Sequence, residues 1–181
     1  SPLYCPSATD PACIKAFYYS RGNFWTFTFP TTTDENGQAH VHPGAIAQRI
    51  TDDGNIYGCL HDHDLGMSMI GAAWTRFGAF SLLANGGEVS DPMPVTMSMN
   101  NGATNGGTVI AGLFTDMSNQ THGYHVRSGV LEPYDATPAA NFTAIWDMNT
   151  HQQFVGVYRL PAEPAPKRHG FVQPPDQSAA I

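Results

Sequence analysis

Charged residues are scarce in this chain: only 13% of its 181 residues are Asp, Glu, Lys or Arg, against about a quarter in a typical globular protein. Only eight are Lys or Arg, they are scattered, and the formal net charge is −7. Binding to nucleic acid or to an anionic membrane needs clustered cations to neutralise phosphates. The composition therefore excludes both classes of partner.

Long apolar runs and cysteines are also scarce. No apolar run approaches the roughly 18 residues that would span a bilayer. Of the three cysteines, Cys5 and Cys13 enclose a short Pro-containing loop and are expected to form a disulfide that pins residues 1–14. Cys59 lies within an expected strand, where a cysteine is more often a buried small hydrophobe. Two Asn-x-Thr sequons, at Asn119 and Asn141, favour a secreted glycoprotein.

Turn-forming residues, by contrast, are abundant. The chain has 18 Gly and 14 Pro, with many Ser, Thr and Asn, a composition typical of short strands joined by tight turns. Residues 15–30 predict an aromatic hairpin, because Thr alternates with Trp and Phe along its second half. We expect an all-β protein with one β-repeat domain over residues 15–173 and a flexible tail over 174–181.

Three stretches repeat one pattern: residues 43–64, 95–116 and 142–160. Each has an apolar run, a polar turn, and an apolar strand that contains a glycine at Gly58, Gly112 or Gly156. A His-Gly-aromatic triplet follows the second and third copies, at 122–124 and 169–171, and Phe77-Gly78-Ala79-Phe80 stands roughly in its place after the first. Each unit is about 45 to 55 residues with four short strands, which is the size of a propeller blade.

Closure of the array is left open by the sequence. Three blades are fewer than the roughly 4 to 8 of an ordinary propeller. The last unit lacks an outer strand, and the N-terminal aromatic strand is expected to close it and to hide exposed edges. Two chains could combine into six blades, giving a homodimer, or three units could close as a smaller barrel or prism. The homodimer is the favoured alternative.

The pattern resembles the HAF-type family of extracellular repeats. Residues 43–45 and 50–58 match the core of that repeat, Ile-x-Asp-x-Gly-x-Ile-x-Gly, and the triplets at 122–124 and 169–171 match its trailing His-Gly-Phe. The resemblance implies secretion and a repeated, propeller-like β architecture. It implies no agreed activity, so function must be inferred from what this chain adds to the repeat.

The main addition is a set of histidines around the first copy. His40 and His42, and likewise His61 and His63, each place two imidazoles on one face of an extended strand. Two such pairs could complete a four-coordinate site for Zn²⁺ or Cu²⁺, and the nearby Met67 and Met69 would favour copper. The alternative is a solvated loop whose histidines bond to backbone carbonyls.

Other side chains could assist such a site. Asp62 and Asp64 point to the opposite face from His61 and His63, and they could orient the ligands or take part in catalysis. His125 does not recur in the repeat, so it is a further catalytic candidate. His122 and His169 do recur, and a recurring residue is more often structural.

Trp25, Trp74 and Trp146 come from different parts of the repeat array. They could be core residues, or some could form an exposed stacking platform for a sugar or another flat ligand.

The sequence therefore leaves two candidate functions. The first is a secreted protein that binds a small molecule or glycan, with a His-rich accessory site. The second is a small extracellular metal-dependent hydrolase, lyase or oxidative enzyme.

Overall fold

A computed structural model describes residues 15–27, 32–33, 36–37, 39–40, 44–62, 67–74, 80–82, 95–127, 130–164 and 167–173. Within these ranges the protein is all-β: one short 3-10 turn, η2 (Asn105–Gly107), accompanies the strands, and no α-helix occurs. No helix in the described ranges is long and apolar enough to cross a membrane. The strands are β1 (Ala16–Ser20), β2 (Asn23–Phe27), β3 (Thr32–Thr33), β4 (Ala39–His40), β5 (Gly44–Ile50), β6 (Ile56–Asp62), β7 (Met67–Trp74), β8 (Phe80–Leu82), β9 (Val95–Ala103), β10 (Val109–Asp116), β11 (Thr121–Arg127), β12 (Val130–Tyr134), β13 (Phe142–Met148), β14 (Phe154–Arg159) and β15 (His169–Gln173).

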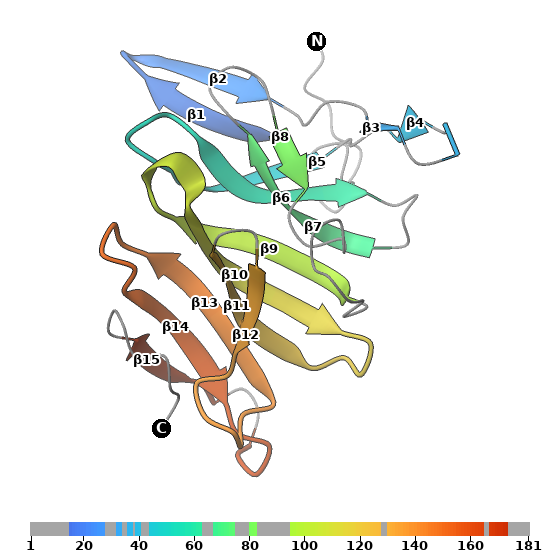
Figure 1. The fold of residues 1–181 in the computed structure, drawn as a ribbon, viewed down its shortest axis with the longest axis vertical. Helices are drawn as coiled ribbons and strands as arrows, with labels where there is room; N and C mark the ends of the chain where they lie inside the picture. The colour runs from blue at the N-terminus through green and yellow to red at the C-terminus, as the bar shows by residue number, and fades with distance from the viewer. Residues whose placement is uncertain are drawn as a thin grey trace.

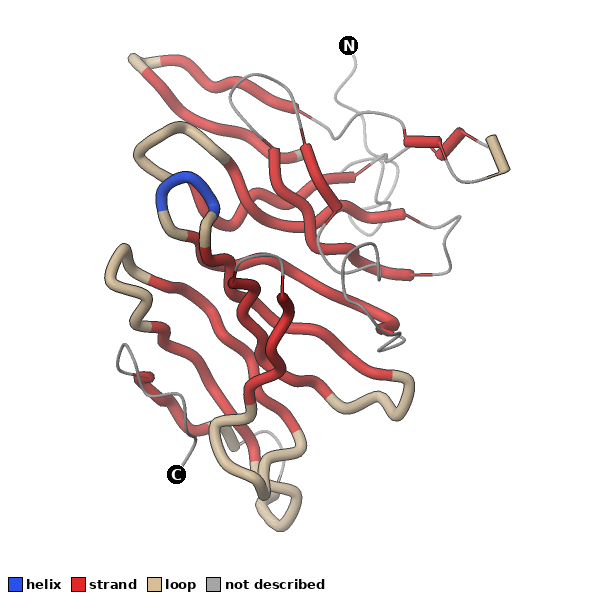
Figure 2. Tube along the Cα trace, viewed as in Figure 1, coloured by secondary structure: helices blue, strands red, loops and turns tan. Residues whose placement is uncertain are grey.

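The strands form antiparallel groups that follow one another in chain order from β1 to β15 (Figure 1). The β1–β2 hairpin and the small β3–β4 pair come first. Unit 1 is the four-stranded sheet β5–β8, unit 2 is β9–β12, and unit 3 is β13–β15. A single parallel bridge between Thr121 and Phe142 joins units 2 and 3 into one seven-stranded sheet. None of the sheets built by the described strands closes on itself, as the strand trace shows (Figure 2).

The repeat glycines occupy one structural position in all three units. Each faces a β-bulge on the first strand of its unit, opposite Ala47, Asn100 or Ile145. A Cβ on Gly58 or Gly112 would lie 1.9 Å from a carbonyl oxygen of that first strand, and one on Gly156 would lie 2.1 Å away. Only glycine allows the two backbones to approach this closely, so the sequence pattern marks a close approach at a bulge.

The same three-residue turn also recurs. In the turns that begin at Thr51, Asp116 and Asn149, the first N–H donates to the carbonyl four residues on, and the fourth N–H donates back to the first carbonyl. The fourth residue has a positive φ in each turn: 83° at Gly54 and 62° at both Asn119 and Gln152. This is a type I turn followed by a left-handed residue, a common connection between antiparallel strands.

The three units meet in one apolar cluster, here called the shared core. It contains the cross-strand pair next to the repeat glycine from every unit: Ile46 with Cys59, Met99 with Leu113, and Ala144 with Val157. Equivalent positions of three units thus converge in space.

Successive groups also pack face to face. The β1–β2 hairpin contributes Ala16 and Phe27 to a cluster with Leu60 and Ile70 of unit 1. Tyr57 of unit 1 packs with Ala103 and Ile110 of unit 2, and Ala111 of unit 2 packs with Ile145 and Phe154 of unit 3. Units 1 and 2 therefore each have one face toward the group before and one toward the group after, and unit 3 has one face toward unit 2.

Two predictions about strand arrangement need correction. In unit 1, Gly71 pairs with Cys59 just as Gly123 pairs with Leu113 and Gly170 pairs with Val157. The equivalent of His-Gly-aromatic is therefore Ile70-Gly71-Ala72 within the single long strand β7, and not the stretch around Phe80. The N-terminal strand also differs: β1 pairs with β2 and lies against unit 1, so within the described chain it does not complete unit 3.

Candidate functional site

A groove between the hairpin and the first strand of unit 1 has the character of a ligand site. Its volume is about 310 Å³, at the lower end of the range of small-molecule pockets. We call it the aromatic groove, and it is lined by Phe17, Tyr18, Tyr19, Ala47, Gln48, Arg49, Ile50 and Ile56. One wall is thus aromatic, and the opposite wall combines polar with aliphatic side chains.

The hairpin supplies the aromatic wall. Its turn consists of Arg21 and Gly22, both with positive φ, which fits the two-residue turn that matches the twist of antiparallel strands. Tyr18 pairs with Trp25 across the hairpin, and their rings stack with centroids 6.3 Å apart and planes inclined by 14°. Trp25, a predicted ligand-binding residue, is 53% exposed. It therefore supports the ring of a groove residue rather than filling a core.

The bulge of β5 supplies the polar wall. Gln48 is the extra residue of this bulge, because the ladder to β6 passes from Ala47 directly to Arg49. A bulge turns its side chains away from the regular ladder, and bulges are common beside functional sites. Arg49 is held in place by Asp147 of β13, whose two carboxylate oxygens each lie 3.2 Å from Nη1. The polar wall of the groove therefore has a guanidinium held by an ion pair beside a more exposed amide.

The other two predicted ligand-binding tryptophans have different settings. Trp74 is partly buried, stacks on Phe27 with centroids 4.9 Å apart, and packs against the cluster between the hairpin and unit 1. This is the core role that the sequence left open for it. Trp146 is the extra residue of the β13 bulge and is 44% exposed. It lies on the strand that carries Asp147, but it does not line the aromatic groove.

The predicted metal site falls largely outside the described residues. His42 and His63 lie outside them, and of His40 and His61 only the backbone is described. The backbone of His61 pairs with Gly44, the first residue of β5, which lies four residues after His40 in the chain. Among the described side chains, no group of three or more His, Cys, Asp or Glu is placed to hold a metal ion.

The predicted catalytic residues are not shown to form one site. Asp62 ends β6, where its backbone pairs with Met67, and Asp64 lies beyond the described residues. His125 lies on β11 in unit 2, with Nε2 2.6 Å from the carboxylate of the opposite residue Glu132. Its ring contacts Phe154 of unit 3. His125 therefore contacts Glu132 and Phe154 at the boundary of units 2 and 3.

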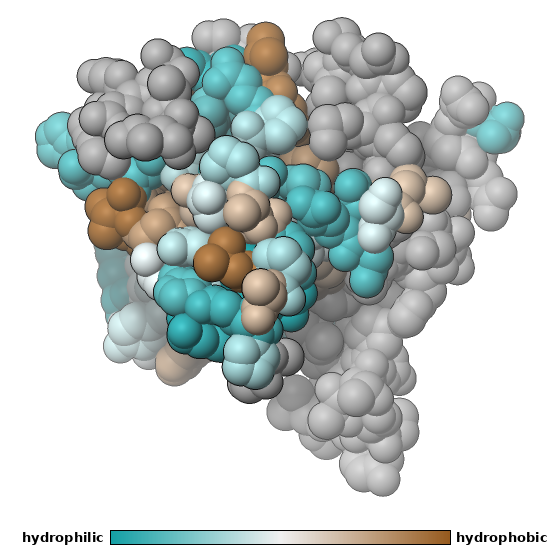
Figure 3. All heavy atoms as spheres, turned by 90° about the horizontal axis from the view of Figure 1, so that it is seen from below, coloured by the Kyte–Doolittle hydropathy of each residue, from teal (hydrophilic) through white to brown (hydrophobic). Residues whose placement is uncertain are grey.

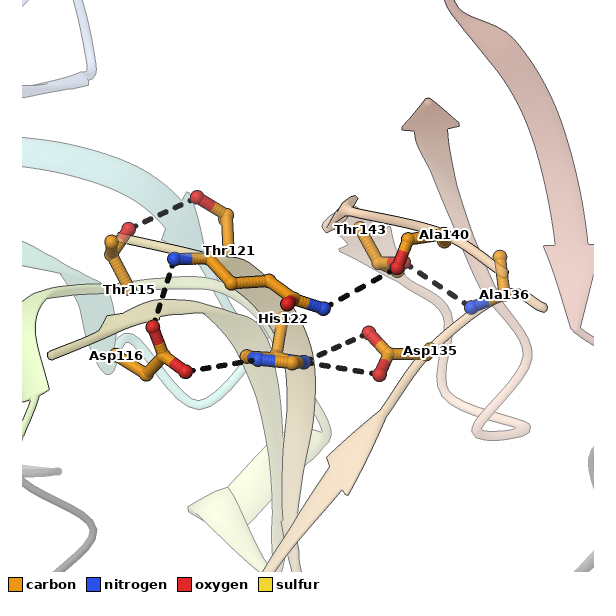
Figure 4. A network of polar contacts seen from close by, with 9 residues as sticks. Thr115, Asp116, Thr121, His122, Asp135, Ala136, Ala140 and Thr143 are labelled. Atoms are coloured by element: carbon orange, nitrogen blue, oxygen red, sulfur yellow. Dashed lines mark hydrogen bonds and ion pairs between the residues drawn. The ribbon is translucent and has the colours of Figure 1, made fainter. Parts of the chain in front are cut away.

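The recurring histidines each pair with an acidic side chain. His122 lies between two carboxylates: its Nδ1 is 3.0 Å from Asp135, and its Nε2 is 3.7 Å from Asp116 (Figure 4). The equivalent His169 has Nε2 2.6 Å from Glu163. Both rings stack on an aromatic of the neighbouring strand, Phe114 and Tyr158 respectively.

The surroundings of His122 indicate a structural role. Two residues away, the backbone N–H of Gln120 donates to the Asp116 carboxylate, and the side-chain amide of Gln120 donates to the carbonyl of Ala140. The network thus ties the β10–β11 turn to the segment leading into unit 3 (Figure 4). Both imidazole nitrogens of His122 thus face a carboxylate of the protein itself.

Sequence reasoning missed the residues that line the aromatic groove, namely Tyr18, Tyr19, Gln48 and Arg49. One signal was available for the tyrosines, since they lie in the aromatic run of the predicted hairpin. No signal marked Gln48 and Arg49, because the bulge appears only when the ladder register is known.

Comparisons of the chain with protein-family models, with curated proteins and with solved structures found no match. The resemblance to HAF-type repeats therefore remains a prediction, and the function has to be argued from the geometry of the groove.

Proposed function

We propose that this is a secreted β-repeat protein that binds an extracellular ligand, a short neutral oligosaccharide, in the aromatic groove. The observation that carries the proposal is the juxtaposition of a tyrosine-bearing wall with Gln48 and Arg49. Sugars present apolar C–H faces that pack on aromatic rings, and hydroxyl groups that bond to planar polar side chains. A site with both kinds of wall matches that chemistry.

A neutral ligand fits the charges of the site better than an acidic one. Arg49 already faces the carboxylate of Asp147 at 3.2 Å, so its positive charge is matched within the protein. The chain as a whole carries a formal net charge of −7, which repels anionic ligands at low salt. Arg49 is therefore assigned to hydrogen bonding with hydroxyl groups rather than to pairing with an acidic sugar.

The finer architecture is part of the same proposal. Units 1 to 3 act as propeller-like blades whose first strands lie nearest to a common axis. Support comes from the equivalent bulges opposite Gly58, Gly112 and Gly156 and from the shared core, to which all three units contribute. In this arrangement the groove lies at the inner edge of unit 1, beside the strand that carries Arg49.

The test is an array of neutral and acidic glycans, followed by titration of the best binder. Gln48→Ala changes a polar wall residue without touching the core, and Tyr18→Ala removes an aromatic wall residue. Each is expected to weaken binding about tenfold, which corresponds to roughly 1.4 kcal/mol. Trp146→Ala is the matched control, because it removes an exposed aromatic outside the groove. Equal loss in all three variants, or binding of acidic glycans alone, contradicts the proposal.

The metal-dependent enzyme is the second candidate. The observation that favours it is the pairing of Gly44 with His61, because Gly44 lies only four residues after His40 in the chain. His40, His42, His61 and His63 would then hold Zn²⁺ or Cu²⁺, with Asp62, Asp64 or His125 assisting. Its test is the metal content of protein purified without a His tag.

A further inference from the structure

The residue just before each repeat glycine shows where the next group packs. In unit 1 this residue is Tyr57, buried against unit 2, and in unit 2 it is Ala111, buried against unit 3. In unit 3 it is Val155, which is 43% exposed. Its cross-strand partner Val172 is 68% exposed. The face of unit 3 that would receive a following group is therefore uncovered by the described residues.

This face of unit 3 is also hollowed. A groove of about 260 Å³ lies over it. We call it the terminal groove, and it is lined by Asp147, Met148, Asn149, Gln153, Val155 and Val172. Seen from the lower end of the molecule, the hydrophobic residues form small patches among hydrophilic ones (Figure 3). Two opposed valines in a groove on an outer sheet face are suited to contact with another apolar surface.

The hairpin presents the complementary face at the opposite end of the array. Its inner face, with Ala16 and Phe27, packs on unit 1. Its outer face carries Phe17, Tyr19 and Phe24, and the Phe24 ring lies 5.5 Å from the Phe17 ring and 4.9 Å from the Tyr19 ring, centroid to centroid. Phe17 and Tyr19 also line the aromatic groove at the edge of this face. Phe24 is 70% exposed. Three clustered aromatics on an exposed face are unusual for a surface that meets only water.

We propose that two copies of this chain associate head to tail, with the outer face of the hairpin of each copy seated on the terminal groove of the other. The order of the groups dictates this pairing. The leading face of a unit is the one toward the group before it in the chain, and the trailing face is the one toward the group after it. The hairpin packs on the leading face of unit 1. The outer face of the hairpin is therefore the one that would meet a preceding unit. The trailing face of unit 3 is the only trailing unit face that the described chain leaves open.

The second copy is favoured as the occupant because this chain itself carries both halves of the contact. Two copies related by a twofold axis satisfy both open faces of both chains at once, and the assembly then closes. The pairing repeats the mode already seen inside the chain, where an apolar trailing face meets an apolar leading face. It rests on the packing of the units, and it shares Phe17 and Tyr19 with the lining of the aromatic groove.

The test is the molar mass in solution, measured by analytical ultracentrifugation over a range of concentrations. The expected mass is twice the 19.5 kDa of the chain. Phe24→Lys and Val172→Lys each place a charge in the contact and are expected to give monomers. Val130→Lys is the matched control, because Val130 is 58% exposed on β12 of unit 2. Thermal unfolding of each variant verifies that the fold is kept.

Mixing the two disrupted variants separates this pairing from any other. When Phe24→Lys is mixed with Val172→Lys, a dimer of one chain of each has one intact contact. That contact joins the unaltered hairpin of the Val172→Lys chain to the unaltered terminal groove of the Phe24→Lys chain. Partial association is therefore expected only in the mixture. A monomeric native chain, an open polymer, or a dimer that survives both substitutions overturns the proposal. Because Phe24 does not line the aromatic groove, glycan binding by the monomeric variant reports on the ligand site separately.

Discussion

Arg49 of β5 and Asp147 of β13 form an ion pair between unit 1 and unit 3, with Nη1 3.2 Å from each carboxylate oxygen. The two residues are equivalent in the repeat, because each is the first paired residue after the bulge of its unit. The equivalent residue of unit 2 is Gly102, on which a Cβ would lie 2.6 Å from the backbone nitrogen of Met148. The missing side chain at Gly102 lets β13 approach, so that the first and third units meet across the second.

We expect this ion pair to show measurable coupling. Both side chains are partly exposed, at 31% and 50%, so the coupling energy is modest, about 0.5 to 1 kcal/mol. The measurement is a double-mutant cycle of Arg49→Gln and Asp147→Asn by urea unfolding, repeated in high salt. Strictly additive effects of the two substitutions would contradict the expected coupling of Arg49 with Asp147.

The repeat glycines are expected to be intolerant of any side chain. Gly112→Ala would place a Cβ 1.9 Å from the carbonyl oxygen of Met99, so β9 and β10 must separate, at a cost of roughly 1 to 3 kcal/mol or more. Gly170→Ala is the control, because the nearest atom to its Cβ is 4.0 Å away. Chemical unfolding should separate the two variants clearly, and equal stability would refute the close approach at the bulge.

The turn of unit 1 is expected to make stability depend on acid pH. Asp53 accepts hydrogen bonds from the Thr51 hydroxyl, from the Gly106 N–H of the neighbouring turn and from Asn55, and these lower the pKa of its carboxyl group. A carboxyl whose pKa is lower in the folded state stabilises the fold above its unfolded pKa, near 3.8. That stabilisation is lost as the pH falls through the lower folded value.

The measurement is urea unfolding of the native protein and of Asp53→Asn between pH 7 and pH 3. The variant should be less stable at pH 7, and the difference should shrink as the pH falls below about 4. Asp52→Asn removes the adjacent carboxylate and serves as control. A difference that stays constant over this pH range would contradict the role assigned to Asp53.

Cys59 is expected to be unreactive in the folded protein. It is fully buried in the shared core, and burial raises the pKa of its thiol to about 12. Because the thiolate is the reactive form, a thiol reagent at pH 8 should not label the native chain. In denaturant without reductant, one thiol should react if Cys5 and Cys13 form the predicted disulfide. Three reactive thiols would contradict the disulfide, and rapid native labelling would contradict the burial of Cys59.

The metal-site hypothesis predicts near one equivalent of zinc or copper in protein purified without a His tag. Inductively coupled plasma mass spectrometry measures it directly, and the metal should be lost in His61→Ala/His63→Ala. His151→Ala is a suitable control, since this exposed histidine lies in the turn between β13 and β14. Protein that contains no metal and takes none up on incubation would leave the histidines without a role as ligands.

Local patterns predicted the strands well because they depend on neighbouring residues. The alternation around Trp25 predicted the hairpin, and the repeated glycines predicted three equivalent strands, which the registers at Gly58, Gly112 and Gly156 confirm. The expected burial of Cys59 is also confirmed. Each of these features follows from a side-chain preference that acts over a few residues.

Features that depend on three-dimensional register were not predictable in the same way. The triplet of unit 1 was assigned near Phe80, because Ile70-Gly71-Ala72 shares only its glycine with His-Gly-aromatic. The ion pair between Arg49 and Asp147 joins residues 98 positions apart. The aromatic groove likewise forms only when the hairpin packs beside the bulge of β5, so no local pattern marks it.

The most direct test of the proposed function is hydrogen–deuterium exchange of the protein with and without the best-binding glycan. We expect the ligand to slow exchange in residues 16–20 and 46–50, the two walls of the aromatic groove, and to leave residues 142–148 unchanged. Protection confined to other parts of the chain, or none under saturating glycan, would contradict the assignment of the groove as the ligand site.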